Sequence, residues 1–403
     1  MNSTIAERER APHYRILILI SIAHFLSDLM TSVVPAMLPV LQRDLDLTYV
    51  QLGVVVTVST LTASIIQPVI GMWIDRKSFA WLLPLAAVFS GIGLASIALV
   101  NSYVTVLLAV IVIGLGSAAF HPEGSRVAYL AAGSRRGLAQ SIFQVGGNAG
   151  QSMGPLMIPL FFLPFGLKGA YWLLLAAVAG GVVLVVVARW YNQFTVKRAA
   201  HTEAAATNDV RQYGALVLLV IVVSMRSWIH IGVQSFLPLY YVNVFGWTVT
   251  VAEVHLFLFL FAGAAGTFVG GALSDRFGKK NMLMFSMWAP IPFIVLLPYL
   301  AEPWSYVNVL VVGFMTLSSF AVTVVYAQQL FPGNVGLVSG LMIGFAIGMG
   351  GIGASVMGGL ADWIGLTRLI QSFALLTLAG WLMGIRLPND KKPGIPAQKG
   401  ISQ

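Results

Sequence analysis

Long apolar runs constrain this chain more than any other feature. Windows of about 20 predominantly apolar residues recur along most of its 403 residues, and a helix of that length spans the hydrocarbon core of a bilayer. Only 9% of the residues are charged, against about 25% in soluble domains, so we predict an all-α membrane protein. We count twelve spans, at roughly 15–39, 49–74, 79–100, 103–126, 138–163, 169–190, 213–242, 253–273, 281–300, 304–330, 337–361 and 367–387.

The polar segments between these runs predict the domain organisation. Residues 191–212 form the only long polar stretch between spans and are predicted to be a cytoplasmic linker. This division gives a six-helix bundle over residues 1–190, a second over 213–387 and a cytoplasmic tail over 388–403. The fourth run is the least well bounded, because its inner end could continue to Ala132.

The distribution of Lys and Arg predicts the orientation. With the N-terminus inside, almost all basic residues outside the spans fall on the cytoplasmic side, and the outer loops hold only Arg43, Lys168 and Arg368. We therefore expect a multi-pass protein of the bacterial inner membrane with both termini in the cytoplasm. The same bias accounts for the net charge of +9 without a nucleic-acid partner.

A short motif occurs in both halves of the chain. The segments "GMWIDRK" and "GALSDRFGKK" each follow an apolar run and share Gly-x-x-x-Asp-Arg with a lysine after it. A motif repeated at so long an offset suggests one module used twice. Glycine allows close helix approach, Asp can face a helix dipole and the basic residues can lie among headgroups. The motif residues, which we expect to form a cytoplasmic gating loop, are Gly71, Asp75, Arg76, Gly271, Asp275, Arg276, Lys279 and Lys280.

Twelve spans in two sixes, a central linker and this repeated turn resemble the major facilitator superfamily over nearly the whole chain. The second turn matches the family's loop signature closely, whereas the first is truncated at Ser78 and Phe79. The resemblance implies two pseudo-symmetric six-helix repeats around a central cavity. It also implies small-molecule transport, membrane lipids as surroundings and a monomer that encloses its own cavity.

A glycine-rich, proline-ended stretch in the fifth span resembles the motif of that superfamily's proton-coupled exporters. Glycines at four-residue spacing favour close helix packing, and a proline removes a backbone hydrogen bond. Ordinary small-residue packing is the alternative interpretation. The strings "FHPEGSR" and "HFLSD" further resemble the fosmidomycin-resistance branch of these exporters, which implies efflux of a phosphonate antibiotic such as fosmidomycin. The motif residues are Gly146, Gly147, Gly150, Gly154 and Pro155.

Ionisable groups within spans are the candidate site residues, because burying them in a membrane is costly. In the first span, His24 and Asp28 lie on one helical stripe with Ser21, Thr31 and Pro35. We expect proton coupling at Asp28, with His24, His121 and Glu123 as further candidates. Three structural roles stay open as alternatives. Asp28 could form an ion pair, His24 could be a hydrogen-bonded histidine without a transport role, as could His230 in the seventh span, and Glu123, which can pair with Arg126, could be a buried brace for the basic loop.

The seventh span carries the candidate substrate cation. Arg226, His230 and Gln234 recur every four residues, and Arg226 lies at a depth similar to that of Asp28. In the resembled fold the first and seventh helices face each other, so we expect Asp28 and Arg226 to line one cavity, and they could pair there. Polar stripes in the fifth and tenth spans are expected around the same cavity, with the substrate candidates Gln144, Asn148 and Gln151, and with Thr316, Ser319, Thr323 and Tyr326.

No enzyme signature occurs, and the contiguous motifs of metal and nucleotide sites are absent, so we predict a non-enzyme without a metal or cofactor. Without an ATP site, uphill transport must use an ion gradient. We therefore predict an antiporter that exports a small, anionic compound in exchange for protons by alternating access. Two alternatives remain: a proton symporter that imports an organic anion or sugar, and a non-transporting receptor with a transporter fold.

Overall fold

The computed structural model describes residues 12–76, 79–133, 135–195, 210–330, 338 and 341–389, and every regular element in these ranges is a helix. The first half contains α2 (Tyr14–Ala36), α3 (Leu38–Leu45), α4 (Tyr49–Arg76), α5 (Leu82–Ile97), α6 (Tyr103–Ala131), α7 (Arg136–Met153), α8 (Leu163–Phe165) and α9 (Leu174–Thr195). The second half contains α10 (Val210–Asn243), α11 (Val249–Phe277), α12 (Lys279–Trp288), α13 (Ile291–Leu296), α14 (Trp304–Leu317), α15 (Phe320–Leu330), α17 (Ala346–Ile364) and α18 (Leu366–Gly384).

Each predicted span overlaps one or more helical segments among the described residues, whereas a count of helices by length and hydropathy differs from twelve. Within the described residues, nine helical stretches are long and apolar enough to cross a membrane, and α5 is a shorter apolar helix. One of the nine, Leu138–Gln193, contains two predicted spans, whereas α17 is not among the nine. The helix of the fourth predicted span ends at Ala131, close to the alternative inner boundary at Ala132.

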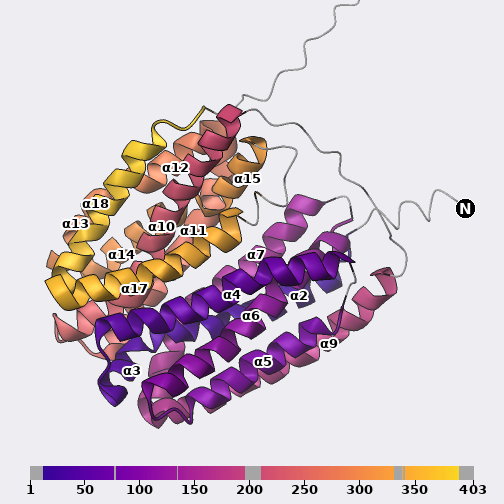
Figure 1. Cartoon of the computed structure of the whole chain (residues 1–403), viewed down its shortest axis with the longest axis horizontal. Coiled ribbons are helices and arrows are strands. Elements are labelled where there is room, and N and C mark those ends of the chain that lie inside the picture. Colours follow the sequence, from indigo (N-terminus) through magenta and orange to yellow (C-terminus); the bar gives the residue numbers. More distant parts are fainter. Residues whose placement is uncertain are drawn as a thin grey trace, which may run out of the picture.

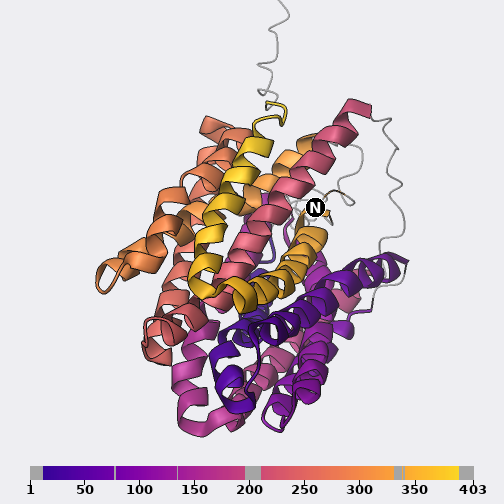
Figure 2. The same ribbon diagram turned by 60° about the vertical axis from the view of Figure 1, so that its left-hand side comes forward.

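Helices α2–α9 and α10–α18 form two bundles that lie side by side (Figures 1 and 2). The N-terminal ends of α2 and α10 and the C-terminal ends of α9 and α18 lie toward one end of the molecule, called the termini end here, and the other end is called the opposite end (Figure 1). Helices α9 and α10 extend the bundles beyond the predicted linker boundaries. The reason is packing, since Tyr191 is fully buried although it follows the last apolar run.

The two bundles meet closely at the opposite end, where α4 packs against α17. A Cβ placed on Gly358 would lie 2.3 Å from the Tyr49 carbonyl oxygen, and one on Gly351 would lie 2.7 Å from Thr60. Nearer the termini end, a Cβ placed on Gly348 would lie 3.4 Å from the Ser64 side chain, and one on Gly344 would lie 3.8 Å from the Ser64 carbonyl oxygen. The two helices therefore diverge toward the termini end, and Figure 1 shows the bundles separating in that direction.

Polar contacts also join the bundles at the opposite end. The Asp362 carboxylate at the end of α17 accepts hydrogen bonds from the backbone N–H groups of Tyr49 (3.0 Å) and Val50 (2.8 Å). These are the first N–H groups of α4, which have no partner within their own helix. Asn243 of α10 donates to Gln42 (2.8 Å) and to the Tyr49 hydroxyl (3.1 Å). A residue of one half thus caps a helix of the other.

The fifth predicted span is not one continuous α-helix. After α7 the chain passes through a 3₁₀ turn at Gly154–Leu156 and a π-helical turn at Ile158–Phe162 before α8. Pro155 and Pro159 lack the N–H that an α-helix needs, which explains the break. Further irregular helical turns occur at Gly166–Leu173, Leu297–Tyr299 and Leu341–Phe345.

The repeated turn is only partly within the described structure. Gly71, Asp75 and Arg76 lie in the last turns of α4, but the surroundings of Gly71 and the side chains of Asp75, Arg76 and Asp275 are outside the described part. In the second copy, Lys280 at the start of α12 donates to the Ile385 carbonyl (3.0 Å) and to Asn389 (3.1 Å). The second copy therefore ties α12 to the C-terminal end of α18, a role that the prediction of headgroup contacts did not include. The remaining residues of this copy are Gly271, at which a Cβ would meet nothing within 4 Å, Arg276, over the Phe277 ring, and Lys279.

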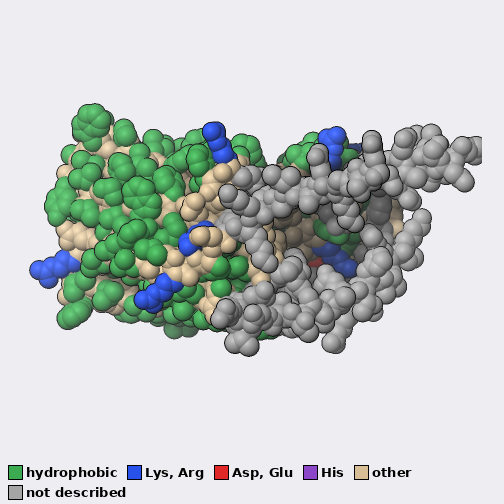
Figure 3. Space-filling model, turned by 90° about the horizontal axis from the view of Figure 1, so that it is seen from above, with side chains coloured by type: hydrophobic (Ala, Val, Ile, Leu, Met, Phe, Trp, Pro, Cys, Tyr) green, Lys and Arg blue, Asp and Glu red, His purple; other side chains and the backbone are tan. Residues whose placement is uncertain are grey.

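The outer surface is apolar in the way that a lipid-facing surface requires. Much of the described surface in Figure 3 is formed by hydrophobic side chains, with few Lys and Arg among them. On α9, Leu175, Val178 and Val182 are each more than half exposed, and Phe268 and Leu375 are similarly exposed in the second bundle. Exposed side chains of this size indicate helices that face lipid.

Candidate functional site

Three ionisable side chains converge in the first bundle. His24 and Asp28 lie one turn apart on α2, and His121 reaches the same carboxylate from α6. The His24 Nε2 atom lies 3.3 Å from Asp28 Oδ2, and His121 Nε2 lies 3.2 Å from Oδ1. His24 is 2% exposed, whereas Asp28 and His121 are 18% and 28% exposed. The cluster thus has a closed side on α2 and an accessible side toward His121.

The backbone fixes the orientation of both imidazoles. His24 Nδ1 lies 2.8 Å from the Phe143 carbonyl oxygen, and His121 Nδ1 lies 2.9 Å from that of Ser117. A carbonyl only accepts, so each Nδ1 carries the donated hydrogen and each Nε2 is directed at the carboxylate. This assignment of hydrogens follows from the hydrogen-bond partners. The His24 ring also stacks on Phe143, with centroids 4.0 Å apart.

The glycine motif of the fifth span makes room for this cluster. A Cβ on Gly146 would lie 2.2 Å from the Ser21 carbonyl oxygen, and one on Gly150 would lie 2.0 Å from that of Phe25. Gly147 faces the site itself, where a Cβ would lie 2.4 Å from His24 Nε2 and 2.8 Å from Asp28 Oδ2. Gly154 similarly abuts Ser32, and Pro155 follows it in the 3₁₀ turn. The motif packs α7 tightly against α2.

A second cluster surrounds Arg226 in the other bundle. The guanidinium donates to Ser319 Oγ (2.7 Å) and to Thr323 Oγ1 (3.5 Å), and it lies 5.3 Å from the centre of the Phe320 ring. Ser286 Oγ lies 2.6 Å from Ser319 Oγ and extends this hydroxyl network to α12. Arg226 is 2% exposed. The predicted polar stripe of the tenth span therefore provides two hydroxyls that accept hydrogen bonds from Arg226.

The other predicted substrate residues lie near these clusters. His230 is one turn from Arg226, and its buried Nε2 has no hydrogen-bond partner among the residues that the structure describes. Gln234 is buried a further turn along α10. On α7, Gln144 donates to Asn148 Oδ1 at 3.3 Å, and Gln151 is partly buried on the same helix.

Asp28 and Arg226 are not an ion pair in this structure. Within the described residues, the ion pairs of Asp28 are with His24 and His121, and the polar partners of Arg226 are hydroxyls. Helices α2 and α10 do contact each other, so the two clusters belong to neighbouring central helices. Helical periodicity placed both side chains on central faces, but it does not determine which groups on other helices they meet.

Two further carboxylates, those of Glu123 and Glu253, are buried in the helices. Glu123 is fully buried on α6, two residues from His121. Glu253 on α11 is also 0% exposed, and neither of its oxygens has a hydrogen-bond partner in the described part of the chain. Glu253 was not predicted as a site residue because it is the first residue of the predicted span 253–273. In the structure α11 begins earlier, at Val249, with Thr248 as its N-cap, so Glu253 lies within the helix. The available signal was a single acid inside the apolar run 249–273.

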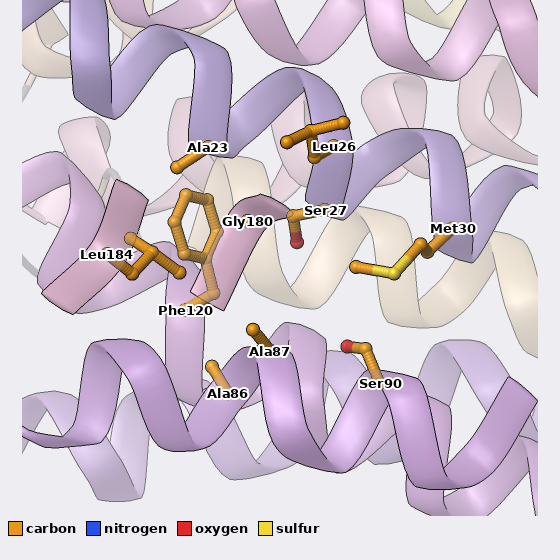
Figure 4. A pocket seen from close by; sticks show the side chains of 10 residues that line it. All are labelled: Ala23, Leu26, Ser27, Met30, Ala86, Ala87, Ser90, Phe120, Gly180 and Leu184. Carbon is orange, nitrogen blue, oxygen red and sulfur yellow. The ribbon is translucent and has the colours of Figure 1, made fainter. Parts of the chain in front are cut away.

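A small cavity lies inside the first bundle but has no charged lining. It is enclosed by side chains of α2, α5, α6 and α9, with the hydroxyls of Ser27 and Ser90 and the ring of Phe120 beside it (Figure 4). Its free space is about that of a single water molecule. This cavity is a gap in the bundle core and is too small for a metabolite.

Comparisons with known proteins agree with this architecture. The family model of the Major Facilitator Superfamily matches residues 20–343 and 235–403. The uncharacterized MFS-type transporter YfnC of Bacillus subtilis (strain 168) is 40% identical over 385 residues, which cover 94% of each protein. The fosmidomycin resistance protein of Escherichia coli (strain K12) is 40% identical over 375 residues, which cover 92% of each.

Solved structures show the same fold at low sequence identity. A bacterial homologue of the human lysosomal transporter Spinster, in an inward-facing and occupied conformation, superposes with a TM-score of 0.73 at 15% identity. The match covers 92% of this chain and 96% of that one. The nucleoside transporter NupG gives a TM-score of 0.70 at 13% identity, and the match covers 92% of this chain and 98% of that one. The chain, with its two helical bundles, belongs to the Major Facilitator Superfamily and is a membrane transporter rather than an enzyme.

Proposed function

We propose that this transporter exports a small anionic compound in exchange for protons by alternating access. The proposed architecture is twelve transmembrane helices, in a bundle over residues 1–190 and a second over 213–387, joined by the linker 191–212 and followed by a tail from 388. A phosphonate such as fosmidomycin is the proposed class of substrate. The 40% identity to the E. coli fosmidomycin resistance protein supports this class.

The buried guanidinium of Arg226 is the main support for an anionic substrate. In the described structure this cation has two hydroxyl partners and an aromatic ring, but no carboxylate partner. A buried charge without a counter-ion is costly, and an anionic ligand bound at this position would supply one. A guanidinium binds phosphonate oxygens through paired N–H donors. His230 and Gln234 on the same face would add neutral hydrogen-bonding groups.

The Asp28 cluster supports proton coupling. Asp28, His24 and His121 form a partly accessible set of groups that can exchange protons, and Glu123 lies on the same helix as His121. The proton gradient is the proposed energy source, at about 2.3 kcal/mol per proton across 100 mV, and this cycle needs no cofactor. Helices α2 and α10 contact each other, so proton uptake at one can alter anion binding at the other.

The structure corresponds in this proposal to the state that is open at the termini end. We assign that end to the cytoplasm because the segments predicted to lie on the same side of the membrane as the N-terminus hold almost all basic residues outside the predicted spans. This assignment places the protein in the bacterial inner membrane with both termini inside. Substrate would enter from this side and leave after the seal between α4 and α17 opens. The proposed partners are the substrate, protons and membrane lipids, without nucleic acid, and the proposed state is a monomer.

A growth assay with fosmidomycin tests the substrate and the two clusters together. Cells that lack their own exporter would express wild type, Asp28→Asn, Arg226→Ala or the control Arg43→Ala, whose side chain is exposed at the opposite end. We expect resistance from wild type and the control, but not from the two site variants at equal membrane expression. Sensitivity of cells with well-expressed wild type would refute the substrate class.

Flux in proteoliposomes separates the alternative functions. With an acidic lumen, an antiporter accumulates external substrate in the lumen, whereas a proton symporter with the same imposed gradient drives substrate out. A receptor with a transporter fold would bind the ligand without flux. If Asp28→Asn retained full exchange driven by the pH gradient, Asp28 would not be the coupling group.

A further inference from the structure

The side chains of His24, Asp28 and His121 have the composition and geometry of a metal site. We propose that the two Nε2 atoms and the Asp28 carboxylate bind a divalent first-row transition-metal ion of the Zn²⁺ class. The three ligand atoms lie within 4.8 Å of one another and come from two helices of one bundle. Binding of this ion does not depend on which compound is transported.

The distances between the ligand atoms fit a small coordination sphere. In a tetrahedral site with bonds of about 2.0–2.1 Å, neighbouring ligand atoms lie about 3.3 Å apart. Two separations in the cluster, 3.3 Å from His24 Nε2 to Asp28 Oδ2 and 3.2 Å from His121 Nε2 to Asp28 Oδ1, have this length. Two imidazoles and one carboxylate form a set of three that binds Zn²⁺ in proteins and leaves a fourth position for water or another ligand.

The surroundings of the two histidines are those of metal ligands. A metal-binding imidazole almost always donates its second N–H to a carboxylate, a carbonyl or water, which fixes its tautomer and ring orientation. His24 donates in this way to the Phe143 carbonyl and His121 to that of Ser117. When both imidazoles are neutral, their Nε2 lone pairs face the carboxylate oxygens. A cation bound between these accepting atoms removes their mutual repulsion, as protons on the imidazoles do in the ion-paired form.

The position of the cluster also allows an ion to reach it. His121 is 28% exposed and Asp28 is 18% exposed, so the site has one open side, while the His24 ring is held from behind by Phe143. Gly147 packs against the other side of the cluster, where an added Cβ would lie 2.4 Å from His24 Nε2 and 2.8 Å from Asp28 Oδ2. The chain has no cysteine, so a metal site in it favours ions that bind nitrogen and oxygen ligands.

A bound ion would occupy the same side chains that the proposed transport cycle protonates. Zn²⁺ is therefore expected to inhibit transport, a consequence that rests on the proposed function. Ion binding itself needs no substrate and no proton gradient. An experiment that detects no ion binding and an experiment that detects no exchange of substrate for protons are therefore separate results.

The test is a titration of the purified full-length protein in detergent, without a polyhistidine tag and after treatment with a chelator. Co²⁺ is the spectroscopic probe, because its visible ligand-field bands report inner-sphere coordination, and Zn²⁺ is then added as a competitor. We expect one saturable Co²⁺ site that Zn²⁺ displaces. Asp28→Asn, His24→Gln and His121→Gln are each expected to weaken binding by at least about tenfold.

His255→Gln is the matched control. His255 is also a buried histidine with one ring nitrogen on a backbone carbonyl, but its Nε2 contacts Ser305 in the second bundle. This variant should bind Co²⁺ as wild type does. His121→Gln removes the most exposed of the three ligands, so it keeps the test decisive if a variant at His24 fails to fold. The proposal is overturned if wild type shows no saturable binding, or if binding persists unchanged in the three ligand variants.

Discussion

Gly147→Ala is the substitution that most directly links the glycine motif to the Asp28 cluster. The added methyl carbon would lie 2.4 Å from His24 Nε2, 2.5 Å from its Cε1 and 2.8 Å from Asp28 Oδ2. Relief of these contacts requires a shift of about 1 Å, since carbon and nitrogen atoms pack at about 3.5 Å. His24 cannot simply move away, because Phe143 holds it by a hydrogen bond and by ring stacking.

The size of the effect follows from overpacking. Additional atoms in a well-packed core cost about 1–3 kcal/mol. If the whole cost falls on the transport step, the rate decreases about 5- to 150-fold, at about 1.4 kcal/mol per factor of ten. A shift of about 1 Å would also lengthen the 3.3 Å contact between His24 and Asp28 beyond the range of an ion pair.

Initial rates of exchange in proteoliposomes, together with thermal stability in detergent, would check this prediction. Gly180→Ala in the same bundle is the matched control, because its Cβ would meet only the Leu26 side chain at 3.7–3.8 Å. Gly150→Ala is a second comparison, since its Cβ would meet the Phe25 carbonyl oxygen at 2.0 Å and should mainly lower stability. A folded Gly147→Ala protein with the exchange rate of wild type would refute the reasoning.

Three further predictions address the Arg226 cluster and the seal between the bundles. Arg226→Lys keeps the charge but loses the paired donors and the contact with Phe320. A hydrogen bond to a charged group contributes about 1.5–3 kcal/mol, so we expect the apparent substrate affinity in a binding assay to fall about 10- to 100-fold. Unchanged affinity would exclude recognition of the anion by the paired N–H donors of the guanidinium. Asp362→Asn weakens the cap on α4 by about 0.5–2 kcal/mol and should open the opposite end in a larger fraction of molecules, whereas the exposed Asp46→Asn at that end should not. Because the chain has no cysteine, introduced cysteines can report this opening by spin-label distances, and identical distance distributions in both variants would contradict a latch at Asp362. Gly358→Leu at the same contact, where a Cβ already lies 2.3 Å from the Tyr49 carbonyl oxygen, should shift the distances in the same direction as Asp362→Asn, and a shift toward closure would count against the seal.

The helices and the glycine packing could be predicted from sequence because each depends on local pattern. Apolar runs of about 20 residues locate helices whatever their neighbours, and the spacing of Gly146, Gly150 and Gly154 places these glycines on one face of α7. That face packs against α2, as the small-residue spacing predicts for some neighbouring helix. The loss of a backbone hydrogen bond was predicted at Pro155, but the end of α7 at Met153 and the 3₁₀ and π turns that follow depend on the packing of the whole segment.

The partners of the charged groups could not be predicted in the same way. The sequence analysis identified Asp28, Arg226 and Ser319 as members of polar stripes, and the structure joins Arg226 to Ser319. It allowed Asp28 to pair with Arg226, whereas the structure gives Asp28 two imidazoles from its own bundle. A helical stripe determines which residues share a face, but the rotation of each helix about its axis determines what that face meets.

The same limit explains why a metal site was not predicted from sequence. A search for contiguous motifs detects ligands one helical turn apart, and His24 and Asp28 have that spacing, but two ligands alone occur often without a metal. The third ligand, His121, comes from α6, and only the packing of α6 against α2 brings its Nε2 within 3.2 Å of the carboxylate. The backbone carbonyls that orient both imidazoles are also invisible in a residue pattern, because every residue has one. Whether the cluster holds protons or a metal ion therefore depends on tertiary packing, and direct measurement of Co²⁺ binding distinguishes the two occupants.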